Sequence, residues 1–331
     1  MKEIIRRIIP TPLRNCYYNA KKNSQLKKLY SYNRKRFVKY GACSDSEDAL
    51  MGYLTMAIHG IEKGITMPDF RAGFGHDRMC DLLDKCEDFI VRYGLNNIQL
   101  THLAQVVYEY NLLHKNLQFK LEDDLQQKID HFLTHFNIDF GQNIQVDFTR
   151  TDYFAHQHDD FIAFSNSRHS ARNFTAEPVS MRLMDKAVQL AQNAPSACNR
   201  QAPRIYIIQD KDKIKQVLAL HGGNRGFGHT VDKLILVCGY LPCYGLNERD
   251  CVYVDCGIFT MNLAYSLHYY GIGNCILNWS VRNENDLALR KIIPVKDEET
   301  VCTLIACGNV PDNFKVCTSG KKTLQQIVNY I

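Results

Sequence analysis

Apolar residues recur at every third or fourth position through most of the first half of the chain, a spacing typical of amphipathic helices. Four such stripes lie between residues 46 and 136. Asp45 or Ser46 precedes the first stripe, where a short polar side chain caps a helix by accepting a hydrogen bond from a free backbone N–H. The pattern therefore predicts an all-helical region, with stripes at residues 49–57, 79–90, 103–113 and 125–136.

The pattern changes beyond about residue 160, where short continuous apolar runs alternate with helical stripes. Three runs have the length and composition of buried strands, and they lie at residues 204–209, 233–239 and 301–307. The stretches between them predict helices at residues 184–191, 214–220 and 253–270. The fold class that this order predicts is α+β, with a mixed or mostly antiparallel sheet flanked by helices.

These patterns divide the chain of 331 residues, which is longer than most single domains, into four parts. The first part is a basic N-terminal arm and the second is the helical extension. A polar linker follows, and the last part is the α+β domain. The expected boundaries are residues 1–40, 41–140, 141–160 and 161–331.

Charge is distributed unevenly over these parts, although the net charge is only +5. Residues 1–40 hold twelve Lys or Arg and one acid, whereas residues 41–160 hold nine Lys or Arg and twenty acids. Because the basic arm has an acidic neighbour in its own chain, binding to nucleic acid is not predicted.

The arm carries apolar residues at four-residue spacing, at Ile5, Ile9 and Leu13, but Pro10 and Pro12 interrupt the pattern. Since proline breaks a helix interior, we expect an early helix break here. Two roles are open for residues 1–40. The arm either docks on the acidic segment or a partner subunit, which we favour, or makes weak contact with an anionic membrane surface.

Composition and cysteine usage indicate an ordinary globular protein of the reducing cytoplasm. The chain is 45% hydrophobic and 23% charged, and it lacks both a membrane-length apolar run and a secretory leader pattern. Thirteen scattered cysteines, an odd number, do not suit a closed disulfide framework. No metal site is predicted, and His156, His158, Asp159 and Asp160 in the linker are interpreted as a solvated turn.

One segment of the helical extension, residues 59–75, mixes glycine with charged side chains. The simpler interpretation, slightly favoured, is a helix stop at Gly64 followed by a Gly/Pro turn. The alternative is a loop that covers an active site. The candidate substrate-cap residues are His59, Glu62, Lys63 and Arg71.

Two segments of the α+β domain carry candidate binding chemistry. Arg168 and Arg172 stand four apart with Ser170 between them, which suits a phosphate dianion gripped by two guanidinium groups and a hydroxyl. Residues 194–201 follow a predicted helix and precede a predicted strand. Such a loop presents backbone N–H groups and the side chains of Ser196, Asn199 and Gln201 to a ligand. No Gly-x-Gly-x-x-Gly run follows a strand, so a Rossmann site is not predicted.

Taken together, these two segments resemble the nitroreductase family, in which an Arg-x-Ser-x-Arg/Lys-x-Phe run precedes a helix and a Pro-Ser-x-x-Asn-x-Gln loop. Glycine turns around Gly271 and Gly308 and basic residues near the C-terminus follow in the family's order. The resemblance spans about half of the chain. It implies FMN bound at a homodimer interface, and a hydride passed from NAD(P)H to flavin N5 and then to a small-molecule substrate. The cofactor-binding residues that it implies are Arg168, His169, Ser170, Arg172, Pro195, Ser196, Asn199, Gln201, Gly271, Gly273, Lys321 and Lys322.

The chain also departs from the family pattern. Ala202 and Pro203 follow Gln201 where the family often has Pro-Trp, and a lysine replaces the usual arginine near the C-terminus. The helical extension, with its His-x-x-Glu-Lys-Gly run, resembles that of a group of nitroreductase-like proteins, some of which are associated with cell-surface polysaccharide biosynthesis. Two alternatives to the reductase function stay open. One is different flavin chemistry, such as dehydrogenation or flavin breakdown, and the other is a redox-inactive partner-binding protein.

Overall fold

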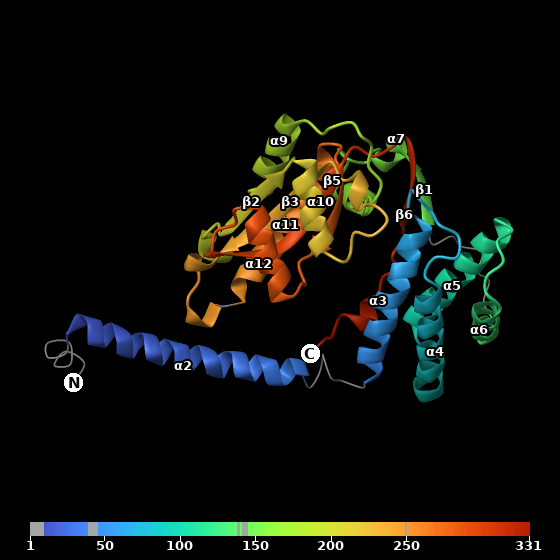
Figure 1. Cartoon of the computed structure of the whole chain (residues 1–331), viewed down its shortest axis with the longest axis horizontal. Coiled ribbons are helices and arrows are strands. Elements are labelled where there is room, and N and C mark those ends of the chain that lie inside the picture. The colour runs from blue at the N-terminus through green and yellow to red at the C-terminus, as the bar shows by residue number, and fades with distance from the viewer. Residues whose placement is uncertain (1–9, 39–45, 138–139, 141–144, 249) are drawn as a thin grey trace.

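A computed structural model describes residues 10–38, 46–137, 140, 145–248 and 250–331. The basic arm forms one long helix, α2 (Thr11–Phe37), which projects to one side of the molecule (Figure 1). The helix begins directly after Pro10, and Pro12 does not interrupt it because Pro12 lies in the first turn, where a missing N–H costs no hydrogen bond. The expected break at Pro10 stays a prediction. Ile5 and Ile9 lie outside the described residues.

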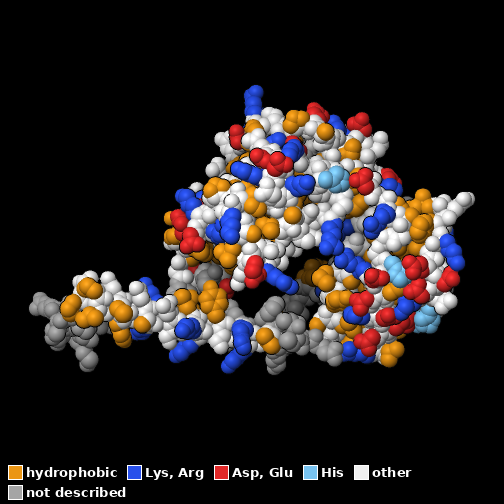
Figure 2. All heavy atoms as spheres, viewed as in Figure 1, with side chains coloured by type: hydrophobic (Ala, Val, Ile, Leu, Met, Phe, Trp, Pro, Cys, Tyr) orange, Lys and Arg blue, Asp and Glu red, His pale blue; other side chains and the backbone are white. Residues whose placement is uncertain are grey.

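The uneven charge is visible on the surface. Figure 2 shows Lys and Arg side chains interspersed with apolar ones along α2, and acidic side chains gathered on the helical region at the opposite end. Tyr17 and Tyr30 are exposed on α2. Among the described residues, no helix combines the length and apolarity needed to cross a membrane.

The helical extension consists of α3 (Glu47–Ile65), α4 (His76–Tyr93), α5 (Ile98–Asn116) and α6 (Asp123–Thr134). The predicted stripes meet in one shared core that includes Leu54, Leu82, Val106 and Ile129. Ser46 caps α3 as expected, since its Oγ accepts a hydrogen bond from the Ala49 N–H at 3.3 Å.

Helix α3 passes Gly60 and Gly64 and ends only at Ile65, so residues 59–65 are helical and the turn is confined to residues 66–75. Gly64 is needed for packing, because a Cβ there would lie 2.0 Å from the ring of Phe74. Gly64 therefore lets the following turn lie close against the helix, and Gly60 leaves room for Arg78 of α4.

The α+β domain is built on a four-stranded antiparallel sheet in the order β2 (Pro203–Ile208), β3 (Lys233–Tyr240), β5 (Glu299–Gly308) and β4 (Gly273–Asn278). The apolar runs predicted as strands form β2, β3 and β5. β4 was missed, since its six residues directly follow the turn after the long helix. The α+β fold class with an antiparallel sheet is confirmed.

Helices cover both faces of this sheet (Figure 1). Side chains alternate along β3, so Ile235 and Val237 face α9 (Met181–Ala191) and α11 (Cys251–Tyr269). Leu234 and Leu236 face the opposite side, where α10 (Lys211–Leu220) and α12 (Asn283–Ile292) pack. The remaining segments are α7 (Arg150–Tyr153), α8 (Phe161–Ser167) and the short 3-10 turns Ala197–Asn199, Gly228–Thr230, Leu241–Cys243, Leu246–Glu248 and Leu324–Gln326.

A second, two-stranded sheet joins the predicted linker to the chain's end. β1 (Gln145–Thr149) pairs antiparallel with β6 (Asn313–Cys317). β1 lies within residues 141–160, the expected linker, so part of that segment is a strand. A short polar strand such as β1 gives little local signal, because its partner lies more than 160 positions away. The four-part domain division stays a prediction.

Candidate functional site

The segment that carries Arg168 and Arg172 runs along the β4 edge of the sheet. It leaves α8 at Arg168, and the Ala171 N–H donates a 3.0 Å hydrogen bond to the carbonyl of Asn274 on β4. At the neighbouring Gly273, a Cβ would lie 2.5 Å from Val310 Cγ1 and 3.3 Å from Ala171 Cβ. Gly273 is thus required for this close packing of the chain on itself, while Gly271 occupies a turn with φ of 70°.

Two pairs of cationic side chains lie beside this segment: the charge of Arg172 acts on Lys63, and the charges of Arg168 and Lys321 both act on His169. We call these four side chains, Lys63, Arg168, Arg172 and Lys321, the cation cluster. Burial and the nearby charge of Arg172 lower the pKa of Lys63. Burial and the charges of Arg168 and Lys321 lower the pKa of His169. Arg172 also donates to Cys317 Sγ at 3.8 Å. Within the described part of the chain, no member of the cluster forms an ion pair with a carboxylate.

Aromatic and imidazole side chains pack against the segment that carries Arg168 and Arg172. The buried Tyr153 hydroxyl donates to the His169 carbonyl at 2.6 Å. His268 on α11 is fully buried, and its Nε2 lies 2.8 Å from Ser167 Oγ. Burial, with the charges of Arg168 and His169, lowers the pKa of His268 to about 4. The sequence signal for His268 is its position in a mostly apolar helix, where a charged or titratable residue is uncommon.

The candidate cap residues separate into three places. Glu62 is buried, its Oε2 lies 2.8 Å from His59 Nδ1, and its Oε1 accepts a 3.1 Å hydrogen bond from the Ser319 N–H. Lys63, on the adjacent position of α3, joins the cation cluster instead. Arg71 is exposed in the turn after α3.

A cavity of about 480 Å³ opens beside Glu62, between the helical extension and the C-terminal tail. Its wall includes His59, His102 and Lys321. His102 Nε2 lies 3.7 Å from Glu62 Oε1, and this contact was not anticipated. The cavity thus places two of the candidate cap residues beside the tail residue that belongs to the cation cluster.

The second motif, residues 194–201, lies elsewhere. It leads into β2, and the Gln201 N–H donates to Ser196 Oγ at 2.9 Å. Three of its non-glycine residues have left-handed backbone angles: Cys198, Asn199 and Gln201, with φ between 49° and 54°. Strained backbone of this kind persists only where the surroundings enforce it, and it is concentrated at functional sites.

Asp255 on α11 enforces this loop geometry. It is buried, and both of its carboxylate oxygens accept hydrogen bonds from the Ala197 N–H, at 3.1 and 3.2 Å. Tyr244 donates to the same carboxylate at 2.7 Å. A cavity of about 260 Å³ lies beside the loop, with Pro195, Ser196 and Gln201 in its wall.

The two motifs are at opposite edges of the four-stranded sheet, since one contacts β4 and the other leads into β2. Helix α11 spans the distance between them. Asp255 holds the loop near one end, and His268 supports the Arg168 segment at the other. Thirteen residues of helix separate Asp255 from His268, which corresponds to about 20 Å. One copy of the chain therefore does not bring the two motifs together.

Other residues considered in the sequence have local partners. His156 Nδ1 lies 2.7 Å from Asp159 Oδ2, in an exposed turn. Arg200, in the second motif, pairs with Glu248 through two contacts of 2.8 Å. Lys322 is exposed, and Ser170 is half-buried.

Comparison with known proteins finds a similarity in the region that carries both motifs. Residues 166–224 match the model of the nitroreductase family. This region is nitroreductase-like. The matched segment contains Arg168 to Arg172 as well as Pro195 to Gln201, whereas Gly271, Gly273, Lys321 and Lys322 lie outside it.

Individual proteins are also similar to parts of this chain. An FMN reductase (NAD(P)H) of Bacillus subtilis (strain 168) is 32% identical over 104 residues, which is 31% of this chain and 39% of that relative. The match therefore spans well under half of the Bacillus protein. Among solved structures, an FMN-dependent nitroreductase of Clostridium difficile R20291 is 19% identical with a TM-score of 0.44, covering 51% of this chain and 98% of that one. A nitroreductase family protein of Streptococcus pneumoniae TIGR4 is 16% identical with a TM-score of 0.44, covering 52% and 100%.

Proposed function

We propose that the chain is an FMN-dependent oxidoreductase that uses NAD(P)H to reduce a small-molecule acceptor. The observation that carries this proposal is the cation cluster, whose four members lack carboxylate partners in the described part of the chain and lie around a nitroreductase-like motif. Bound FMN would supply the redox chemistry, accepting and donating hydride at its N5 position. The protein's own residues would then bind the FMN, orient it and shield it from water.

The donors of the cation cluster fit the phosphate end of this cofactor. A phosphate monoester carries close to two negative charges at neutral pH, and guanidinium groups bind its oxygens in pairs. Arg168 and Arg172 provide two such groups, and Lys63 and Lys321 add point charges from α3 and from the tail. The helical extension would thus contribute one phosphate ligand, Lys63, in addition to covering the site.

The flavin ring requires the second motif, which one copy of the chain holds about 20 Å away along α11. We infer that a second copy supplies it, with Ser196, Asn199 and Gln201 of one protomer facing the cation cluster of the other. Apolar side chains on the outer face of α11 support such an interface, since Tyr253, Val254 and Ile258 are 54%, 59% and 40% exposed. Association of two copies would bury them.

The proposal is tested by the colour and redox behaviour of the purified full-length chain. We expect protein that retains FMN, shows the visible absorption of an oxidised flavin and loses it anaerobically on addition of NADH or NADPH. Protein that binds no added FMN would instead support the redox-inactive, partner-binding alternative. Flavin that stays oxidised with both nucleotides, but is reduced by a small-molecule donor, would support the dehydrogenating alternative.

A further inference from the structure

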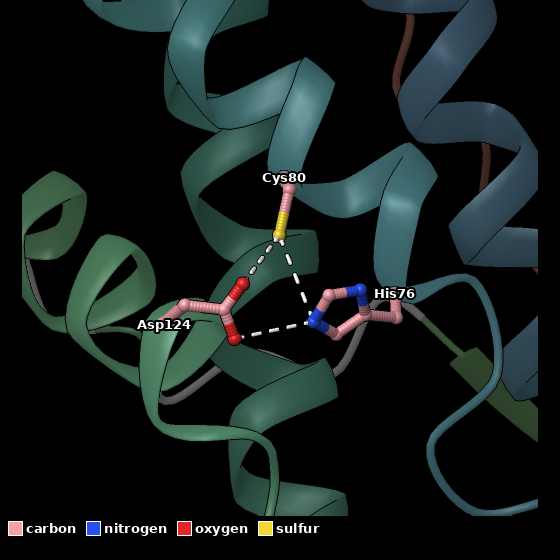
Figure 3. A group of neighbouring side chains, drawn as sticks. All are labelled: His76, Cys80 and Asp124. Carbon is pink, nitrogen blue, oxygen red and sulfur yellow. Dashed lines mark hydrogen bonds and ion pairs between the residues drawn. The ribbon is translucent and has the colours of Figure 1, made fainter.

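A separate group of ligand-type side chains lies in the helical extension, where two helices begin side by side. His76 is the first residue of α4, Cys80 stands one turn later on the same helix, and Asp124 lies in the first turn of α6. Figure 3 shows the three side chains pointing toward one another from these two helices. His76 Nε2 is 3.3 Å from an Asp124 oxygen, and Cys80 Sγ is 4.0 Å from both His76 Nε2 and Asp124.

Two further carboxylates complete the surroundings of His76. Glu122, which directly precedes α6, places Oε2 3.5 Å from His76 Nε2. Asp77 places Oδ1 3.1 Å from the other ring nitrogen, Nδ1. With Nδ1–H donated to Asp77, the free electron pair of His76 is on Nε2 and faces Cys80, Glu122 and Asp124. A carboxylate behind a histidine in this way is the usual partner of a metal-binding imidazole.

These separations match the edges of a small tetrahedral coordination shell. Metal–ligand bonds of about 2.0 Å to nitrogen or oxygen and about 2.3 Å to sulfur place neighbouring ligand atoms roughly 3.3 to 3.6 Å apart. The contacts of 3.3 and 3.5 Å are within that range, and the two contacts to sulfur are longer by a few tenths of an ångström. The ligand atoms of His76, Cys80 and Asp124 lie within 4.8 Å of one another, so small side-chain movements would bring them onto one ion. A movement of the exposed Glu122 carboxylate, which contacts His76 Nε2, would supply a fourth ligand.

We propose that His76, Cys80, Glu122 and Asp124 form a zinc site, which we call the His76 site. A thiolate with an imidazole selects zinc over magnesium or calcium, which prefer shells made only of oxygen. Binding releases the Cys80 proton to solvent, because the thiolate is the ligand. Four protein ligands leave no open position, so the ion has a structural role and takes no part in hydride transfer.

A zinc ion at the His76 site would stabilise the arrangement of the helices around it. It ties the start of α4 to the start of α6, and so fixes the end of the turn at residues 66–75 that follows α3. Helix α3 carries Glu62 and Lys63, which contact the tail and the cation cluster. Zinc at the His76 site thereby stabilises the helical surface that faces the proposed cofactor.

A rival group lies farther along the same two helices. Glu87 on α4 places its carboxylate 2.9 Å from His135 Nε2 and 3.7 Å from His131 Nε2 on α6. It offers two imidazoles and one carboxylate but no thiol. Cobalt bound to the Glu87 group would show no thiolate-to-metal absorption band, so absorption spectroscopy distinguishes this group from the His76 site.

The test uses the full-length chain, stripped of metal with a chelator and then titrated with Zn²⁺ alone or with Co²⁺ alone as a spectroscopic probe. We expect one equivalent of tightly held zinc, and a near-ultraviolet thiolate-to-cobalt absorption with the intense visible bands of tetrahedral cobalt. Cys80→Ser should abolish the thiolate band. Cys16→Ser, which removes an exposed thiol on α2, should leave the band unchanged.

Further variants test the zinc site independently of Cys80, in case Cys80→Ser folds poorly. Asp124→Asn and His76→Ala should each lower zinc affinity at least tenfold. The circular dichroism spectrum of each metal-free variant should match that of the parent. His131→Ala, the control, should leave zinc affinity unchanged. Asp77→Asn should weaken binding less than His76→Ala. The proposal is overturned if the cobalt spectrum lacks a thiolate band, or if His131→Ala removes the zinc while His76→Ala retains it.

Discussion

The backbone N–H of Ser319 donates a 3.1 Å hydrogen bond to Oε1 of Glu62, a residue 257 positions earlier in the chain. Glu62 is 1% exposed, and its second oxygen contacts His59. The bond holds the tail segment that carries Lys321 against α3. Lys63, which directly follows Glu62 on α3, belongs to the same cation cluster as Lys321. A carboxylate on the helical extension thereby positions a cation of the C-terminal tail.

Removing this carboxylate should loosen the tail and weaken anion binding together. In Glu62→Ala the Ser319 N–H and the His59 ring lose their acceptor, which we expect to cost about 1–3 kcal/mol of unfolding free energy. Urea unfolding measures this loss, and fluorescence titration with FMN measures affinity. Glu47→Ala, an exposed glutamate on the same helix, is the matched control. Unchanged FMN affinity in Glu62→Ala would show that the tail does not need this bond.

The cation cluster should determine FMN affinity. Arg168→Ala and Arg172→Ala should each weaken FMN binding by about ten- to a hundredfold, because a charge-assisted hydrogen bond contributes roughly 1.5–3 kcal/mol. Lys63→Ala should weaken it as well, since Lys63 lies close to Arg172. Arg200→Ala is the control, because Arg200 is occupied by Glu248. Equal FMN retention in the Arg168 and Arg200 variants would contradict the assignment.

The burial of His268 predicts a loss of stability in acid. Its pKa is about 4 in the folded protein and about 6.5 when unfolded, so the unfolded state binds more protons between these values. The unfolding free energy should therefore fall as the pH drops from about 6.5 toward about 4, by up to about 3 kcal/mol from this group.

Urea unfolding at about pH 7 and about pH 4.5 measures this effect. His268→Gln, which cannot be protonated in this range, should flatten the pH dependence. The buried His221 and the half-buried His169 keep part of the slope, since burial lowers their pKa values as well. His156→Gln, at an exposed position, should behave like the parent. An unchanged slope in His268→Gln would mean that another group controls acid stability.

The proposed second copy makes the outer face of α11 essential for flavin binding. Ile258→Asp places a charge where two copies would meet, so we expect monomers by light scattering and at least a tenfold loss of FMN affinity. Leu287→Asp changes a leucine on α12 that is 61% exposed and should affect neither measurement. A monomeric Ile258→Asp protein with parental FMN affinity would show that one chain suffices.

Local pattern determined most of the architecture. The apolar stripes of α3 to α6 and the runs of β2, β3 and β5 are legible along the chain, because burial of one helix face or of a whole strand imposes a short-range period. The Arg168 to Arg172 run and the Pro195 to Gln201 loop are legible for a similar reason. Each motif is a contiguous segment whose residue types suit one ligand.

The sequence alone determined these elements and the motif chemistry, whereas the tertiary structure decided which distant residues meet. β1 pairs with β6, Lys63 lies near Arg172, and Lys321 lies near His169, across separations that no local period reports. His76 and Cys80 are visibly one helical turn apart in the sequence, but Asp124 reaches them only through the packing of α6 on α4. Long-range strand pairing also sets the strand order β2-β3-β5-β4. This order places the Arg168 to Arg172 run and the Pro195 to Gln201 loop at opposite edges of the sheet, with helix α11 between them.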